Sequence, residues 1–519
     1  MTQQLAVLPR HALPSRLAVT WPRARVRGVF WLIAVLAVQA GMSVHLIWSN
    51  TAFQDEALYL WAGRLEISHW LHGTTLPLFT VYFSGAPVIY PVLGAAASDI
   101  GGLAAARLVS AAFMLATTAL LWATTVRLHG RRPAALAVAL FACLGPTIHL
   151  GALATFDAPA EFLVALAAWC VVRAGSRGDQ TRWMLAASGA LLLANVTAYS
   201  SAIFDPVVIV LATVTCLPAP GGKAAVRRGA AVAAYLTAAL AILIAASSGY
   251  YLTGITQTTV LRAAGHDSPA AVLGWAGRWA GLVICLAVVG TTWCWASPAR
   301  RPGALLPLTL AVAGLLAPLE QARLHTTVSL DKHTDIGAWF AAIGAGYTVS
   351  QLLAWLSRGA WRPASTAACA AALLLTGRAG LAQAKALYAW PDAARFVTSF
   401  APLAERHGRL LVEDPSVAEY YLPAGDQWQR WSNTRSVQLP SGHNSGVPVG
   451  GSGGPALYAR LIRRGYFSVV ALNFMATPGL DRQIAADLRR NPSYRVIAVI
   501  GYGTGAYTIW RHNAARRPA

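Results

Sequence analysis

The sequence predicts a polytopic α-helical membrane protein of about 11 transmembrane helices, followed by a small C-terminal α/β domain outside the cytoplasm. The chain has 519 residues, of which 56% are hydrophobic and only 12% are charged, whereas soluble proteins carry about 25% charged residues. Apolar runs long enough to cross a bilayer recur as far as residue 390, since about 20 residues span its hydrocarbon core. This composition excludes a soluble enzyme.

The predicted organisation has three parts. Residues 1–28 form a basic cytoplasmic tail, 29–390 form the transmembrane domain with its first outer loop at 49–103, and 391–519 form the extracytoplasmic domain. The first apolar run, 28–48, is too long for a signal-peptide core and is read as an uncleaved helix. The ten further spans are predicted at 104–126, 133–153, 158–174, 183–202, 205–220, 226–248, 278–297, 303–319, 336–356 and 364–388.

The basic residues give the predicted orientation. The formal net charge is +21, from 41 basic and 20 acidic residues. Arginines cluster in alternate short loops on the side of the basic amino terminus, as the positive-inside rule requires of cytoplasmic loops. No basic stripe alternates with aromatic residues, so nucleic acid is rejected as a partner. We therefore expect a multi-pass plasma-membrane protein with a cytoplasmic N-terminus and an extracytoplasmic C-terminal domain.

The first outer loop has two expected elements. Residues 57–71 have apolar and polar groups at helical spacing and predict a helix lying at the membrane interface. Residues 86–100 are apolar but short and are broken by Pro87 and Pro91, so we expect a surface or re-entrant segment there. Counting 86–100 as a span would place the later arginine clusters outside, against the positive-inside rule.

In the C-terminal region, short segments typical of strands and helices replace the long apolar runs. The segments RLLVED, FSVVALNF and RVIAVIGYG predict strands, while ALYARLIRRG and DRQIAADLRR predict helices. Between them a loop rich in glycine, serine and proline, SGHNSGVPVGGSGGP, is expected to be mobile. The six cysteines lie in or beside apolar spans without metal spacing, so we expect neither a disulfide framework nor a metal site.

The first candidate for chemistry is the pair Asp55 and Glu56, directly after the first span. A carboxylate in mid-bilayer is costly, so this pair must lie at the water boundary. There it can take a proton from an attacking hydroxyl or bind a sugar hydroxyl. The structural alternative is that Asp55 only caps the helix that follows.

Further candidates collect on the same predicted side of the membrane. Asp157 lies in a short turn between two spans, where it is either a helix cap or a functional acid. A basic cluster contains His325, Lys332 and His333, and basic groups at a membrane surface suit a lipid-linked phosphate, although Lys332 could also pair with Asp331. The remaining two candidates, which break the positive-inside pattern and suit an anionic partner, are Arg64 and Arg107.

Several of these segments resemble a known family. FQDEALYLWAGR, a proline-broken stretch, AARLVSAAFMLATTALLW and TFDAPAEFLVALAAW are similar to membrane glycosyltransferases of fold type C, above all the protein O-mannosyltransferase and aminoarabinose-transferase group. The resemblance covers residues 28–175 well and extends more loosely to SLDKHTDIGAWFAAIGAGY. It implies that Asp55 is the acidic residue that orients or deprotonates the acceptor, with Glu56 as its neighbour and Asp157 as the acid of the second outer loop.

The resemblance also implies a function. A sugar would pass with inversion, on the outer face, from a polyprenyl-phosphate donor to a hydroxyl of a glycan, protein or lipid acceptor, with membrane lipids around the enzyme. Bacterial relatives usually carry Lys-Pro-Pro where this chain has Gly85-Ala86-Pro87, so Lys332 or Arg64 is expected to replace the lost lysine. No cofactor is required, and a divalent metal is compatible but not indicated. The alternatives are a lipid-linked sugar flippase or transporter, and a non-catalytic cell-envelope assembly protein.

Overall fold

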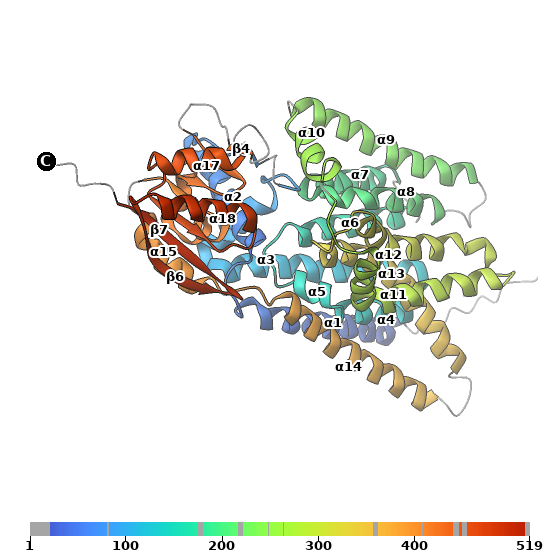
Figure 1. Cartoon of the computed structure of the whole chain (residues 1–519). Coiled ribbons are helices and arrows are strands. Elements are labelled where there is room, and N and C mark those ends of the chain that lie inside the picture. Colours follow the sequence, from blue (N-terminus) through green and yellow to red (C-terminus); the bar gives the residue numbers. More distant parts are fainter. Residues whose placement is uncertain are drawn as a thin grey trace, which may run out of the picture.

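The computed structural model has two parts, a helical bundle and a small α/β domain packed at one end of it (Figure 1). It describes residues 21–79, 83–174, 180–215, 222–247, 249–262, 264–356, 362–405, 408–439, 446–448 and 454–513. Most of the predicted cytoplasmic tail therefore lies outside the described residues, and helix α1 (Trp21–Ile47) contains the rest of it.

A helix of the bundle corresponds to each predicted span. After α1 these are the second part of α3 (Tyr90–His129), α4 (Arg131–Ala142) with α5 (Gly145–Leu150), α6 (Asp157–Ala174), α7 (Gln180–Thr197), α8 (Asp205–Val214), α9 (Gly222–Ala246), α11 (Pro269–Ala296), α12 (Leu305–Arg323), α13 (Leu330–Leu356) and α14 (Arg362–Leu387). A short α10 (Tyr250–Ile255) follows α9. The helical, multi-pass character predicted from hydropathy is therefore confirmed.

The number of spans remains a prediction. By length and composition, seven helices in the described part of the chain can cross a membrane: α1, α3, α9, α11, α12, α13 and α14. The count of about 11 also included α4 with α5, α6, α7 and α8. Helices α4, α5 and α8 have 12, 6 and 10 residues. Helices α6 and α7 have 18 residues each but do not qualify by composition, and residues of all these helices pack into the bundle core.

The first loop contains the predicted interfacial helix as α2 (Gln54–His72). Of residues 86–100, expected to be a separate surface or re-entrant segment, 90–100 form the first part of α3, which begins at Tyr90. Non-helical torsions at Gly101 and Gly102 interrupt α3, and the φ of Gly102 is 66°, which glycine adopts without the steric cost of a Cβ. The interruption separates this first part of α3 from the predicted span.

Helix α13 occupies the centre of the bundle. It packs against α4, α11 and α12, and small residues allow the helix backbones to come close. A Cβ added at Gly346 would lie 2.4 Å from the carbonyl oxygen of Pro133, and one added at Gly337 would lie 2.7 Å from that of Ala313. This packing fixes the position of the first turn of α13, which contains Lys332.

The C-terminal domain has a five-stranded mixed sheet in the order β2-β1-β5-β7-β6. Strands β2 (Trp431–Ser432), β1 (Leu410–Val412) and β5 (Val469–Leu472) are parallel, while β7 (Gly505–His512) runs antiparallel to β5 and to β6 (Tyr494–Tyr502). A separate hairpin joins β3 (Ser436–Gln438) to β4 (Gly446–Pro448). The helices are α15 (Ala394–Ala404), α16 (Ser416–Tyr421), α17 (Gly454–Arg463) and α18 (Pro478–Arg490).

The sequence predicted part of this domain. The three predicted strands are β1, β5 and β6, and the two predicted helices are α17 and α18. Strands β2 and β7 and helices α15 and α16 were not predicted. Most of the loop expected to be mobile lies outside the described residues, and its described residues contribute β4 and the start of α17.

The C-terminal domain packs on the first loop. The backbone N–H of Ala52 donates to the hydroxyl of Tyr421 at 2.8 Å, and the indole N–H of Trp61 donates to the carbonyl of Gly425 at 3.0 Å. One apolar cluster includes residues from α2, α6 and α16. These contacts fix the domain relative to the start of α2, where Asp55 lies.

Candidate active site

Asp55, Asp157 and Lys332 come together at the ends of three helices. Asp55 is in the first turn of α2, Asp157 begins α6, and Lys332 is in the first turn of α13. The Lys332 ammonium lies 2.8 Å from a carboxylate oxygen of Asp55 and 3.2 Å from one of Asp157. Helix N-termini carry a partial positive charge, so each acid lies at a helix end that attracts negative charge.

The three side chains differ in exposure. The side chain of Lys332 is 6% exposed and that of Asp157 is 9% exposed, whereas 32% of the Asp55 side chain is exposed. Asp55 is therefore the acid of this group that an entering molecule can reach. An ammonium has three N–H donors, so Lys332 can hold both carboxylates and keep one donor for another group.

Glu56 points away from this cluster and forms a buried, bidentate pair with Arg107. Its two carboxylate oxygens lie 2.8 and 2.7 Å from the Nε and Nη2 atoms of Arg107. The same carboxylate accepts the backbone N–H groups of Phe53 and Ala154, at 2.8 and 2.7 Å. The other guanidinium hydrogens bond to the carbonyls of Ile47, Asn50 and Thr51.

All five N–H donors of Arg107 therefore have partners, and the residue is 1% exposed. The expectation that Arg107 binds an anionic substrate does not fit this arrangement, because the guanidinium has no donor left. The geometry instead supports a structural role for Glu56 and Arg107. They join the end of α1, the start of α2 and the turn before α6.

Arg64 lies away from the cluster. It is nine residues after Asp55 on α2, which is about 13 Å along the helix axis. Its guanidinium donates to the Tyr420 carbonyl at 2.7 Å and lies 3.2 Å from a carboxylate oxygen of Asp99. Two cavities of about 360 and 380 Å³ are lined by Arg64 and Asp426, but neither is lined by Asp55, Asp157 or Lys332. Arg64 thus fastens α16 to α2.

The two candidate histidines lie in different surroundings. His325 is exposed, has a φ of 51°, and contacts the carbonyl of Asp267 through Nδ1 at 3.0 Å. His333 is half-buried, contacts Gln321 at 2.7 Å, and interacts electrostatically with Lys332 and Asp157. The structure therefore places His333, next to Lys332 in the chain, within electrostatic reach of the cluster, and shows no such interaction for His325 among the described residues.

Asp267 holds the loop before α11 to the loop before α13. Its carboxylate accepts hydrogen bonds from the hydroxyl and the backbone N–H of Thr327, both at 2.7 Å. These two bonds lower the pKa of Asp267 below its usual value. Asp267 therefore keeps the segment that precedes Lys332 in place.

Arg262 is a cation that the sequence analysis missed. It is half-buried and interacts electrostatically with His333. Its side chain makes no hydrogen bond or ion pair with any residue that the structure describes. Its position in a polar turn at a predicted membrane surface was the available signal, but nothing in the sequence brought it close to His333.

Two further acids lie one helical turn beyond the Lys332 cluster along α6 and α13. Glu161 is one turn after Asp157 on α6, and Asp335 is one turn after Asp331 on α13. Asp331 lies 2.9 Å from His149, and Lys332 pairs with Asp55 and Asp157 instead of with Asp331. The i, i+4 spacing of these acids was visible in the sequence.

In the part of the chain that the structure describes, no three His, Cys, Asp or Glu side chains are placed to hold a metal ion.

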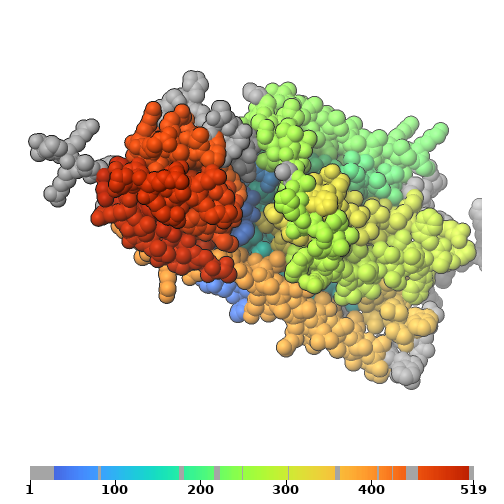
Figure 2. Space-filling view, viewed as in Figure 1, coloured from blue at the N-terminus to red at the C-terminus, as the bar shows by residue number. Residues whose placement is uncertain are grey.

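The C-terminal domain contributes acids near the same place. Burial raises the pKa of Asp414, and hydrogen bonds with Ser416 oppose this increase. The charge of Arg435 also lowers the pKa of Asp414, and that of Asp55 raises it. Burial and the nearby Asp414 raise the pKa of Glu419 well above its usual value. Figure 2 shows a hollow between this domain and the green and yellow helices, and the blue first-loop segment is visible in it.

Comparison with known proteins identifies the fold class. The family model for dolichyl-phosphate-mannose-protein mannosyltransferases matches residues 95–251. The chain is similar to the oligosaccharyltransferase AglB from Archaeoglobus fulgidus in complex with an inhibitory peptide and a dolichol-phosphate, with a TM-score of 0.58 and 12% identity over 95% of this chain and 75% of that one. A search of curated proteins finds no significant match.

Two other solved structures give the same result. ArnT from Cupriavidus metallidurans bound to undecaprenyl phosphate matches with a TM-score of 0.58 and 13% identity, over 94% of this chain and 99% of that one. The mycobacterial arabinofuranosyltransferase AftD matches with a TM-score of 0.51 and 15% identity, over 93% of this chain and 42% of that one. The predicted resemblance is confirmed: the chain has the fold of the type C membrane glycosyltransferases.

Proposed function

We propose that this chain is a membrane glycosyltransferase that moves a sugar from a polyprenyl-phosphate donor to an acceptor hydroxyl. One observation carries the proposal: Asp55, a partly exposed carboxylate, is held by a buried lysine that it shares with Asp157. This pair lies in a fold whose relatives were solved with undecaprenyl phosphate and with dolichol-phosphate. The site therefore has an accessible proton acceptor where a lipid-linked donor and a hydroxyl could meet.

The proposed reaction is a single displacement. Asp55 orients the acceptor hydroxyl and takes its proton while the hydroxyl oxygen forms a bond to the anomeric carbon of the sugar. The bond from that carbon to the phosphate oxygen breaks on the opposite face, so the configuration inverts. The leaving polyprenyl phosphate keeps the electron pair, and nearby cations stabilise its charge. This chemistry does not require a metal, and activity is expected to persist in a chelator.

The orientation belongs to the same proposal. The arginine-rich turns, such as the one between α3 and α4, would face the cytoplasm together with the amino terminus. The Asp55 cluster and the C-terminal domain would then face the outside. A protease added to intact cells is expected to reach the C-terminal domain, and protection of that domain would contradict the proposed orientation.

The direct test uses a labelled polyprenyl-phosphate sugar and membranes that contain the protein. A glycosyltransferase cleaves the donor and releases the sugar to an acceptor or to water. A flippase moves the intact sugar-lipid between leaflets without breaking this bond. Intact donor on the opposite leaflet, with no cleavage, would refute the proposed function.

Arg262 is the proposed contact for the donor phosphate. Its side chain has no partner among the described residues, and it lies near His333 beside the cluster. We expect Arg262→Gln to raise the donor KM by about 10-fold with little change in kcat, because a lost charge-assisted hydrogen bond is worth about 1.5–3 kcal/mol. Steady-state kinetics with varied donor measure this. An unchanged donor KM would remove Arg262 from the phosphate site.

We propose that the main role of Lys332 is to position Asp55, and not to bind the donor phosphate. We expect Lys332→Met to lower kcat by about 10-fold or more with a small change in donor KM, because misplaced catalytic groups cost rate. Kinetics with varied donor and saturating acceptor measure both values. A raised donor KM with an unchanged kcat would instead assign Lys332 to the phosphate.

A further inference from the structure

The carboxyl ends of strands β1 and β5 form one edge of the C-terminal sheet. The two strands are parallel neighbours, with Leu410 opposite Val469, so the residues that follow them lie at the same edge. Ligands of parallel sheets bind outside the carboxyl ends of the strands. The residues at this edge include Asp414 after β1 and Met475 after β5.

A buried carboxylate makes this edge rigid. Glu413 is 3% exposed and accepts the backbone N–H groups of the four residues 473–476 at 2.5 to 2.8 Å. Phe474 is held with a φ of 62°, a conformation that a non-glycine residue rarely adopts. The side chain of the next residue, Met475, is 63% exposed. The loop therefore presents an apolar side chain on a fixed backbone.

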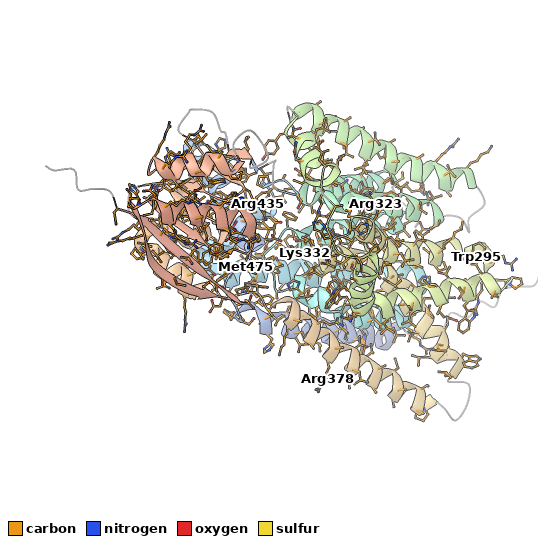
Figure 3. The ribbon with its side chains drawn as sticks, viewed as in Figure 1. Trp295, Arg323, Lys332, Arg378, Arg435 and Met475 are labelled. Carbon is orange, nitrogen blue, oxygen red and sulfur yellow. The ribbon has the colours of Figure 1, made fainter. Side chains whose placement is uncertain are left out.

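This edge of the C-terminal sheet is held close to the candidate active site by contacts of α16. Asp414 is followed at once by α16, whose Tyr421 hydroxyl accepts the N–H of Ala52, three residues before Asp55. The negative charge of Asp55 also acts on Asp414. In Figure 3, Met475 lies on the side of the domain that faces the bundle, and Lys332 lies on the side of the bundle that faces the domain.

Arg435 provides a free cation at this edge. Its backbone N–H donates to the Asn433 side chain at 2.8 Å, which fixes the turn. Its guanidinium is exposed and makes no hydrogen bond with the residues that the structure describes, although its charge acts on Asp414. A free guanidinium recognises phosphate or carboxylate groups with two parallel hydrogen bonds.

We propose that this edge is the acceptor subsite, in which Arg435 binds an anionic group of the acceptor and Met475 packs against its apolar part. The acceptor is thus a molecule that carries a phosphate or carboxylate near the hydroxyl that receives the sugar. This inference rests on the proposed glycosyltransferase function. It separates the two substrates: the donor phosphate would bind at Arg262, on the bundle, and the acceptor anion at Arg435, on the C-terminal domain.

The test uses isolated membranes, whose own molecules serve as acceptors, and a labelled polyprenyl-phosphate sugar. The labelled product is first separated from the remaining donor, which is itself an anionic phosphodiester, and is then expected to bind an anion exchanger. Loss of binding after phosphate removal with aqueous hydrogen fluoride indicates a phosphate, and loss after carboxyl methylation indicates a carboxylate. A neutral product would overturn the proposal.

The matched variants are Arg435→Gln, Arg435→Lys and Arg489→Gln, the last on the exposed far end of α18. We expect Arg435→Gln to lower transfer at limiting acceptor about 10-fold or more, and Arg435→Lys to restore part of it. Donor hydrolysis by water and the Arg489→Gln variant should be unaffected. Unchanged transfer in Arg435→Gln, or an equal loss of hydrolysis, would overturn the proposal, whereas a wild-type protein that neither transfers nor hydrolyses would refute the proposed function itself.

Discussion

Asp55→Asn is expected to reduce sugar transfer by about 100-fold or more while the protein remains inserted and folded. The amide has nearly the shape of the carboxylate but cannot take a proton, and general bases typically contribute about 10² to 10⁴ in rate. Transfer of labelled sugar by equal amounts of purified variant and wild type measures the loss. Because the two side chains have nearly the same volume, the substitution leaves no cavity, and Asp55 is already partly exposed to water.

The matched control is Asp99→Asn. Asp99 is also an acid near the first loop, but it is more exposed and pairs with Arg64 rather than with Lys332. We expect this variant to transfer sugar at close to the wild-type rate. Near-normal transfer by Asp55→Asn, or equal losses in both variants, would contradict the assigned role of Asp55.

Arg107→Met is expected to destabilise the protein strongly. The substitution leaves the Glu56 carboxyl group, which is 0% exposed, without its partner Arg107, and breaking a buried ion pair by removing one member costs about 3–5 kcal/mol. Thermal unfolding of the detergent-solubilised protein, followed together with its abundance in the membrane, measures the effect. If Arg107 only bound the donor phosphate, stability would be unchanged and the donor KM would rise.

A surface pair gives the control for this prediction. Arg323 and Glu320 pair on α12, with the Arg323 side chain 68% exposed. Such exposed pairs contribute about 0–1 kcal/mol, so Arg323→Met should leave the unfolding temperature almost unchanged. Equal destabilisation by the two arginine substitutions would contradict the structural role of the Glu56–Arg107 pair.

The fold was predictable where a local pattern determines it. Apolar length predicted the helices of the bundle, and short apolar runs predicted β1, β5 and β6. Strand β7 was missed because GAYTIWRH mixes polar and apolar residues without a clear alternation. Gly101 and Gly102 interrupt α3, but two glycines in an apolar run do not by themselves reveal where a helix bends.

The site was predictable residue by residue but not as an arrangement. The positive-inside rule placed Asp55, Asp157 and Lys332 on the same predicted side of the membrane. Asp55 and Lys332 are 277 positions apart in the chain, so the sequence did not show that they form an ion pair. Glu56 and Arg107, 51 positions apart, were assigned to chemistry because sequence does not show that all their hydrogen-bonding groups have partners. Arg262 was missed because its significance depends on a tertiary neighbour, His333.

The most direct test of the account follows the phosphorus of the donor. A polyprenyl-phosphate sugar is a phosphodiester, and transfer converts it to the monoester polyprenyl phosphate, which has a different ³¹P resonance. With purified protein in nanodiscs, we predict that the wild type converts the diester to the monoester and that Asp55→Asn does not. A diester that persists with the wild type, or equal conversion by Asp55→Asn, would contradict the account.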